Sequence, residues 1–119
     1  MAEKKLPHDH HSAMEQDFDH MPAPEAFGLT AALFKMMSDP NRVRLFWLLC
    51  HCEECVLNLS AMMNMSSPAL SHHLKLLKAV GLIVSRREGK EVYYRASDSV
   101  RADALHHIIE HVAEITCPV

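Results

Sequence analysis

Long apolar stretches are missing from this chain of 119 residues. No run approaches the roughly 18 consecutive apolar residues that a membrane-spanning helix needs. The first residues, Met-Ala-Glu-Lys-Lys, also lack the apolar segment of a secretory signal peptide. We therefore expect a protein that stays in the reducing cytoplasm, where its four cysteines would remain thiols or bind metal rather than form a disulfide framework.

Glycine is scarce as well, and three glycines against eight methionines favour a domain built mainly from helices. The chain length suits one domain with a hydrophobic core and leaves no room for two. The sequence has no glycine-rich phosphate loop, no nucleophile elbow and no acid pair with a plausible cleft. We therefore do not expect an enzyme.

The formal net charge of −3 argues against a nucleic-acid partner until its distribution is considered. Residues 1–25 carry two lysines and six carboxylates, a formal charge of −4. Residues 66–95 carry six basic and two acidic side chains, a formal charge of +4. This asymmetry predicts a polyanionic partner for the second segment.

Residues 1–22 are polar, contain Pro7 and Pro22, and show no sustained hydrophobic period. We predict that they form a largely disordered tail and that residues 23–119 form one domain. Four histidines of the tail could bind a metal ion weakly, although a solvated tail is the simpler interpretation; they are His8, His10, His11 and His20.

Apolar residues then recur at three- and four-residue steps, which predicts helices over about residues 24–39, 40–50, 56–64 and 67–81. Asp39 can cap the second helix, with Pro40 at its first position. Asn64 tolerates the left-handed conformation that ends a helix, and a serine followed by Pro68 can begin the next one. Two helices joined by a four-residue turn, the second polar and basic outside, indicate a helix-turn-helix.

After Gly81 the hydrophobic period changes to two residues. Residues 82–87 and 91–95 flank a turn that contains Gly89, which predicts a β-hairpin. Ser97 or Asp98 is expected to cap a last helix with an apolar stripe. The predicted fold is mainly α with a β-hairpin wing, in the order α-α-α-α-β-β-α, a winged helix-turn-helix.

Four motifs in this order carry a resemblance to a known family. They are Ser-Asp-Pro-Asn-Arg at 38–42, Ser-Ser-Pro-Ala-Leu-Ser-His-His-Leu-Lys-Leu-Leu at 66–77, Gly-Leu-Ile-Val at 81–84 and Arg-Arg-Glu-Gly-Lys-Glu-Val-Tyr-Tyr at 86–94. From about residue 25 to 116 the chain resembles the ArsR/SmtB family of metal-responsive winged-helix repressors. The resemblance implies a homodimer formed through the first and last helices. It also implies a recognition helix in each major groove of an imperfect palindrome, and repression that an inducer lifts.

The predicted recognition helix and wing carry side chains suited to double-stranded DNA. Serine hydroxyls let a helix sit deep in the groove, and lysine and arginine neutralise phosphates. The alternative is a solvated helix face beside a solvated hairpin. The candidate DNA-binding residues are Ser66, Ser67, Ser71, His72, Lys75, Lys78, Arg86, Arg87 and Lys90.

The first candidate sensing site is Cys50-x-Cys52-x-x-Cys55, with Cys117 as a possible fourth thiol. Thiolates select soft or borderline ions such as Zn(II), Cd(II), Pb(II), Cu(I) or trivalent arsenic. We expect Zn(II), Cd(II), Pb(II) or As(III) to be the inducer. Family members often carry a Cys-x-Cys pair at the head of the third helix. That pair aligns here with Cys55 and Leu57, so one of its two thiols is retained. The alternative, buried cysteines acting as small apolar residues, suits Cys50 best.

The second candidate site lies on the last helix, where some family members bind zinc between paired helices. The corresponding positions hold Asp98, Val100, His111 and Glu114, and His107 could substitute for the valine that cannot ligate. The alternative is an ordinary solvated helix face.

Two other functions stay open. Cys50 and Cys117 resemble the paired cysteines of redox- and persulfide-sensing family members, so a disulfide or polysulfide bridge could be the switch in an otherwise identical repressor. A metal buffer that does not bind DNA is disfavoured by the recognition-helix and wing motifs.

Overall fold

The computed structural model describes residues 7–8 and 20–115 of the chain. The chain divides into two units, Met1–Ala32 and Leu33–Val119, and the second unit holds every element that follows α2. Most of the predicted tail of residues 1–22 lies outside the described residues. In the part that is described, no helix is long and apolar enough to cross a membrane.

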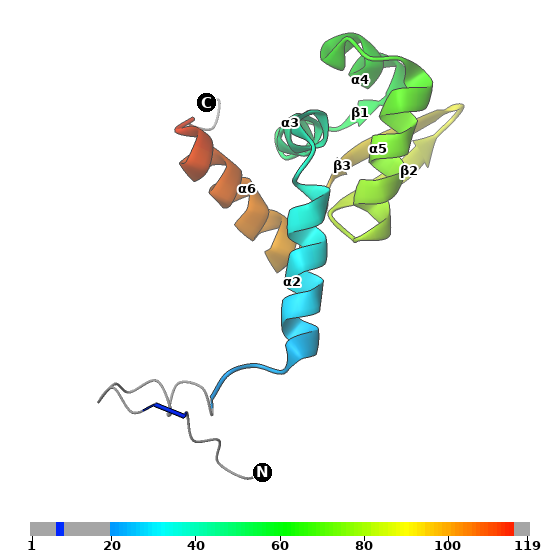
Figure 1. The fold of residues 1–119 in the computed structure, drawn as a ribbon. Helices are drawn as coiled ribbons and strands as arrows, with labels where there is room; N and C mark the ends of the chain where they lie inside the picture. Colours follow the sequence, from blue (N-terminus) through cyan, green and yellow to red (C-terminus); the bar gives the residue numbers. More distant parts are fainter. Residues whose placement is uncertain (1–6, 9–19, 116–119) are drawn as a thin grey trace. The chain divides into compact units, whose positions relative to one another are not determined.

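The element order agrees with the prediction, with one added strand (Figure 1). The elements are α2 Pro24–Met36, α3 Pro40–Leu49, β1 Glu54–Cys55, α4 Val56–Met63, α5 Ser67–Ala79, β2 Ile83–Glu88, β3 Glu91–Ala96 and α6 Val100–Ala113. Helices α4 and α5 form the helix-turn-helix, and β2 and β3 form the wing. The winged helix-turn-helix expected from the sequence is therefore confirmed.

Polar side chains define the helix ends as the sequence predicts, except at α6. Asp39 accepts a hydrogen bond from the Arg42 backbone N–H at 3.0 Å, which also lowers the pKa of the Asp39 carboxyl. Asn64 ends α4 in the left-handed conformation with φ of 50°, and Ser66 caps α5. These are the local signals that favour a turn between two helices.

The cap of α6 is Ser99, not Ser97 or Asp98 as the sequence suggested. The Ser99 hydroxyl accepts from the Ala102 backbone N–H at 3.1 Å. Ser97 is still held by the sheet region, because its backbone N–H donates to the Leu82 carbonyl at 2.9 Å and its hydroxyl donates to the Gly81 carbonyl at 2.9 Å. Because these two bonds hold Ser97 outside the helix, α6 begins only after Ser99.

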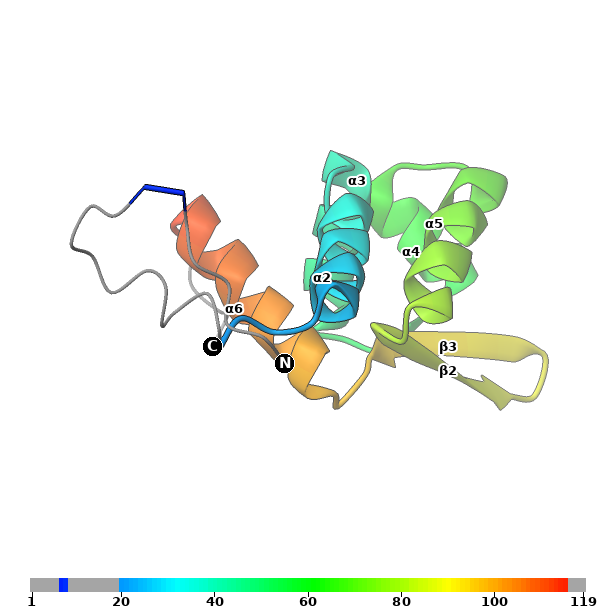
Figure 2. The ribbon, with the colours of Figure 1, turned by 60° about the horizontal axis from the view of Figure 1, so that its bottom comes forward.

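A three-stranded antiparallel sheet has the order β1-β3-β2. The hairpin pairs Ile83 with Ala96 and Glu88 with Glu91, and its turn contains Gly89 with φ of +63°. Figure 2 shows the hairpin extending away from α6. Strand β1 was not expected from the sequence, because two residues are too short to show a period; it joins the cysteine-rich segment to the wing.

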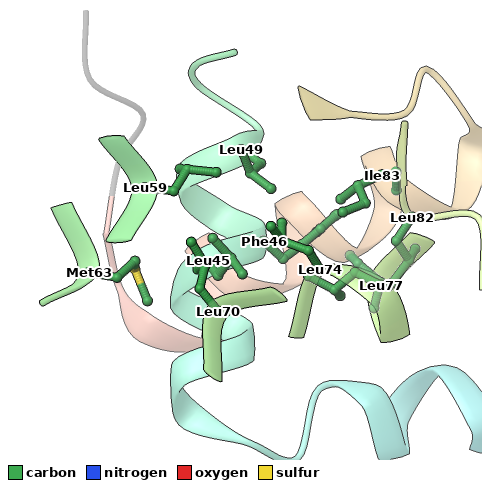
Figure 3. Close-up of a cluster of buried hydrophobic side chains, with 12 residues drawn as sticks. Leu45, Phe46, Leu49, Leu59, Met63, Leu70, Leu74, Leu77, Leu82 and Ile83 are labelled. Carbon is green, nitrogen blue, oxygen red and sulfur yellow. The ribbon is translucent and has the colours of Figure 1, made fainter. Parts of the chain in front are cut away.

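Helix α3 lies at the centre of the hydrophobic core, as its nearly all-round apolar pattern predicts. Leu45, Phe46 and Leu49 of α3 are buried among side chains from α4, α5, the start of β2 and α6 (Figure 3). The surrounding buried residues are Leu59, Met63, Leu70, Leu74, Leu77, Leu82, Ile83, Ala102 and Leu105. One core thus fixes the recognition helix, the wing and α6 relative to α3.

Candidate DNA interface and metal-ligating residues

Helix α5 is amphipathic, and its buried side fixes which residues face outward. Leu70, Leu74 and Leu77 pack into the core, while the serines and lysines that the sequence predicts to contact DNA lie on the exposed side. All nine candidates are exposed: Ser66, Ser67, Ser71, His72, Lys75, Lys78, Arg86, Arg87 and Lys90. Ser71 and Lys75 lie one helical turn apart on this surface.

Some of these side chains have partners within the protein. The Ser66 hydroxyl caps α5 by accepting from the Ala69 backbone N–H at 3.3 Å. The Ser67 hydroxyl lies 3.2 Å from that of Ser60 on α4. The Lys78 ammonium donates to the Ser85 hydroxyl at 2.7 Å, which joins α5 to β2. These contacts hold the helix-turn-helix and the wing as one surface.

Arg86 of the wing is held by acidic neighbours. Its guanidinium lies 2.7 Å from a carboxylate oxygen of Glu53 and 2.6 Å from one of Glu88, and it stacks over the Tyr93 ring. The pKa of Arg86 is raised mainly by its hydrogen bond to Glu53 and secondly by its hydrogen bond to Glu88. The Arg86–Glu53 hydrogen bond also lowers the pKa of Glu53. Arg86 must therefore exchange carboxylate contacts for phosphate contacts if it binds DNA. Arg87 and Lys90 form no ion pair with a carboxylate of residues 7–8 or 20–115.

His73 is buried on the inner side of α5, whereas the adjacent His72 is exposed. The His73 side chain is buried, and its Nδ1 atom has no hydrogen-bond partner among the described residues. Burial lowers the pKa of His73, and the nearby Asp39 carboxylate acts in the opposite direction. The ring is therefore favoured in its neutral form inside the domain.

The three candidate thiols within the described residues have different surroundings. Cys50 packs against the core, and Cys52 is half-buried. Cys55 is buried immediately before α4, and its backbone is opposite Tyr93 in the antiparallel pairing of β1 with β3. Burial, and then the Glu54 carboxylate, raise the pKa of Cys52. An ion that binds Cys52 must displace its proton. Cys117 lies outside the described residues.

An open groove of about 640 Å³ runs between the cysteine-rich segment and α6. Cys50, His51 and Cys52 line one side of it, and Asp103 and His106 line the other. The groove therefore places the cysteine-rich segment next to the first half of α6.

The second candidate site of the sequence lies on the solvent side of α6. His107, His111 and Glu114 are exposed, and the Asp98 side chain is 91% exposed and 3.4 Å from the Arg95 guanidinium. The Nδ1 atom of His107 lies 2.7 Å from the Asp103 carbonyl oxygen. In the described part of a single chain, neither this set nor the three thiols forms a group of three or more converging metal ligands.

The ligand atoms that do converge belong to His51, His106 and Glu110. His51 follows α3, and the other two lie one turn apart on α6. The Nε2 atoms of His51 and His106 are 3.2 Å apart. One carboxylate oxygen of Glu110 lies 3.2 Å from Nε2 of His106 and 3.5 Å from Nε2 of His51. Sequence reasoning missed this group. The spacing of His106 and Glu110 was a visible signal, but only the tertiary fold brings His51 to them.

Comparisons with known proteins agree with this architecture. Residues 39–85 match the family of bacterial regulatory proteins described as the arsR family. The chain is 36% identical over 84 residues to a transcriptional repressor SmtB homolog of Synechocystis, over 71% of this chain and 64% of that protein, just under two thirds of the relative's length. It is 38% identical over 86 residues to the arsenical resistance operon repressor of Escherichia coli, over 71% of this chain and 74% of that protein.

Solved structures of similar proteins share this architecture. HlyU from Vibrio cholerae superimposes with a TM-score of 0.70 at 28% identity, over 76% of this chain and 97% of that one. A homodimeric winged helix-turn-helix DNA-binding domain from Mycobacterium bovis superimposes with a TM-score of 0.67 at 26% identity, over 79% of this chain and 88% of that one. The Synechocystis and Escherichia coli relatives are both named as repressors.

Proposed function

Because the chain belongs to the ArsR family of bacterial regulatory proteins, we propose that it is a homodimeric repressor that leaves its operator when a thiophilic metal or metalloid ion binds. The class of ion is Zn(II), Cd(II), Pb(II) or As(III). The relatives include a repressor named for arsenical resistance and a transcriptional regulatory protein named for cadmium resistance. Each step of the proposal has its own support.

DNA binding is supported by the exposed polar side of α5 and by the wing. The serines and His72 of α5 enter the major groove, and Lys75 and Lys78 contact the phosphates that flank it. Arg87 and Lys90 of the wing reach the adjacent backbone or minor groove. Two such units in a dimer read an imperfect palindrome.

Dimer formation through the first and last helices is supported by apolar side chains that each helix exposes. On α6, Val100 is 87% exposed and Val112 is 76% exposed. On α2, Phe27 and Phe34 are also exposed. Apolar surface of this kind favours a symmetric partner that covers it.

The observation that carries the metal response is how the cysteine-rich segment is attached. Cys55 is the N-cap residue of α4 and pairs with Tyr93 in the sheet. Glu53, two residues earlier, forms the ion pair with Arg86 of the wing. An ion that draws these thiols together therefore acts on the helix-turn-helix and on the wing at once.

Release requires that the ion bind the low-affinity dimer better than the DNA-competent dimer. A coupling free energy of about 1–3 kcal/mol, typical of such linked sites, changes DNA affinity by roughly 5- to 150-fold. Movement of Cys52 or Cys55 toward an ion would shift Glu53 and the start of α4, and with them the two surfaces that contact DNA. An ion at Asp98, His107, His111 and Glu114 would act instead through the dimer interface.

The test is fluorescence anisotropy of a labelled duplex that the fully reduced protein has selected from a random pool. Zn(II), Cd(II), Pb(II) and As(III) are added in turn to the complex. Release by one of them, with thiolate-to-metal charge-transfer absorption, supports the proposal. The double variant Cys52→Ser/Cys55→Ser is expected to bind the duplex and to lose this release, and His107→Gln/His111→Gln is the matched control on α6.

Unchanged release in the double cysteine variant would overturn the thiol assignment. Release only after treatment with polysulfide or peroxide would replace the metal by a redox trigger at Cys50 and Cys117. Binding of no duplex from the pool would overturn the repressor function itself.

A further inference from the structure

A group of three metal-ligating side chains lies where α3 ends against α6, and it shares no ligand with either candidate site of the sequence. His51 comes from the segment after α3, and His106 and Glu110 come from α6. Their side chains are only 12–19% exposed. Two imidazoles and a carboxylate at the edge of the core call for a physical explanation, because such groups are costly to bury unless they are bound to one another or to an ion.

The spacing of the three ligand atoms matches one face of a zinc coordination sphere. Ligand atoms about 2.0–2.1 Å from a tetrahedral zinc ion stand roughly 3.3–3.4 Å from each other. The observed separations are 3.2 Å between the two Nε2 atoms, 3.2 Å from His106 to Glu110 and 3.5 Å from His51 to Glu110. The three side chains therefore need little movement to bind one ion together.

The protonation chemistry of the group also favours a cation. Two neutral imidazoles whose Nε2 atoms face each other share at most one proton between those atoms. An ion at the centre accepts a lone pair from both nitrogens and from the carboxylate at the same time. It also balances the negative charge of Glu110.

Trp47 of α3 supplies the outer contact that metal sites commonly have. Its indole Nε1–H donates to the same Glu110 oxygen at 3.1 Å, and its ring lies 4.6 Å from the His51 ring. Hydrogen bonds of this type orient a ligating carboxylate. His51 and His106 also line the groove described above, from which a water molecule could reach an ion as a fourth ligand.

We propose that His51, His106 and Glu110 form a binding site for Zn(II) or a similar borderline divalent cation, contained within one protomer. Two imidazoles, one carboxylate and an open position are a donor set that zinc accepts readily and that differs from an all-thiol site. The bound ion joins the end of α3 to α6. The site shares no ligand with the thiol site, so variants of its ligands test it separately from the proposed function.

Trp47 provides the measurement, because it is the single tryptophan of the chain and contacts two of the three ligands. The full-length reduced protein is titrated with Zn(II) after removal of metal by a chelator, and Trp47 emission is recorded. We expect a saturable change in Trp47 emission. Histidines of the N-terminal tail that also bind zinc would add to the metal content without defining this saturation point.

Two residues of α6 give a matched pair of variants. His106→Gln is expected to weaken the zinc-dependent change of Trp47 emission by about tenfold or more, since losing even an outer-shell partner costs about that much. Arg101→Gln changes an exposed residue of α6 that belongs to none of the candidate metal sites, and it is expected to retain the change. Glu110→Gln keeps an acceptor for Trp47 and removes the charge, so it repeats the test if His106→Gln does not fold.

Three results would overturn this site. The first is an unchanged zinc response in both His106→Gln and Glu110→Gln. The second is loss of the response in Arg101→Gln. The third is loss of the response in Cys52→Ser/Cys55→Ser, which would place the ion at the thiols. Retention of the response in that double variant, with loss of DNA release, would support this site and the proposed function separately.

Discussion

The hydrogen bond between Trp47 and Glu110 predicts a measurable contribution to stability, because it joins α3 to α6 directly. Glu110 is 12% exposed, so its charge is poorly solvated, and Trp47 donates to it at 3.1 Å. Hydrogen bonds to charged groups contribute about 1.5–3 kcal/mol. His51 and His106 remain beside the carboxylate in Trp47→Phe. We therefore expect the lower part of that range.

The predicted shift follows from the size of the protein. An unfolding entropy of about 2.1 cal/mol/K per residue gives roughly 0.2 kcal/mol/K for the approximately 100 residues that the structure describes. Loss of about 1.5 kcal/mol then lowers Tm by about 7 °C. The assay is thermal unfolding followed by far-UV circular dichroism, with a chelator present and at one fixed protein concentration, since a dimer would make Tm depend on concentration.

A double-mutant cycle with Trp47→Phe and Glu110→Ala separates the hydrogen bond from packing. We expect a coupling free energy of about 1 kcal/mol or more between the two positions. A coupling near zero would refute the reasoning, because the indole would then stabilise the domain by burial alone. A Tm change below about 2 °C for Trp47→Phe would refute it as well.

Three further predictions concern α6, the core and the DNA interface. Ser99→Ala is expected to lower stability by about 1 kcal/mol because it removes the cap of α6, whereas Asp98→Ala should leave Tm nearly unchanged; equal effects in thermal melts would contradict the cap assignment. Burial lowers the pKa of His73 in the folded protein below the ordinary histidine pKa of 6.5. As the pH falls below 6.5, His73 therefore takes up a proton in the unfolded chain before it does so in the folded protein. The free energy of unfolding decreases over this interval, from pH 6.5 down to the pKa of His73 in the folded protein. In urea titrations between pH 7.5 and pH 5, His73→Phe should therefore lose stability less steeply than the wild type, and equal slopes would exclude His73 as the cause. Lys75→Ala should weaken DNA binding and reduce the slope of log K against log salt by about 1, while Lys35→Ala in α2 leaves the slope unchanged; equal slopes in all three proteins would remove Lys75 from the phosphate contacts.

Most of the fold could be predicted because its signals are local. The Asp39-Pro40 pair, Asn64 and Ser66 each satisfy helix-end groups within three or four residues, so they can be recognised without knowledge of the rest of the chain. The change of hydrophobic period after Gly81 likewise identifies the hairpin. The position of the α6 cap could not be predicted, because the bonds that hold Ser97 come from Gly81 and Leu82, distant in sequence.

The candidate site was less accessible to sequence reasoning for the same physical reason. Exposure of the α5 serines and lysines follows from helical periodicity, and the structure places them as expected. Convergence of His51 with His106 depends on how α3 packs against α6, which periodicity does not encode. The cysteines on either side of His51 also favour a thiol site when the sequence is considered alone.

The strand order has a consequence for how the wing is kept from aggregating. Because β3 is central, β2 lies at the edge of the sheet, and the backbone groups on its outer side could pair with a strand of another molecule. Arg86, Arg87 and Glu88 occupy this strand, and all three are exposed. Charged side chains on an edge strand discourage such pairing. Apolar replacements of the wing arginines would therefore leave an edge strand that can pair with a strand of another molecule. Glutamine is for this reason the safer substitution for probing DNA contacts. The residues of β2 are thus constrained by solubility as well as by DNA recognition.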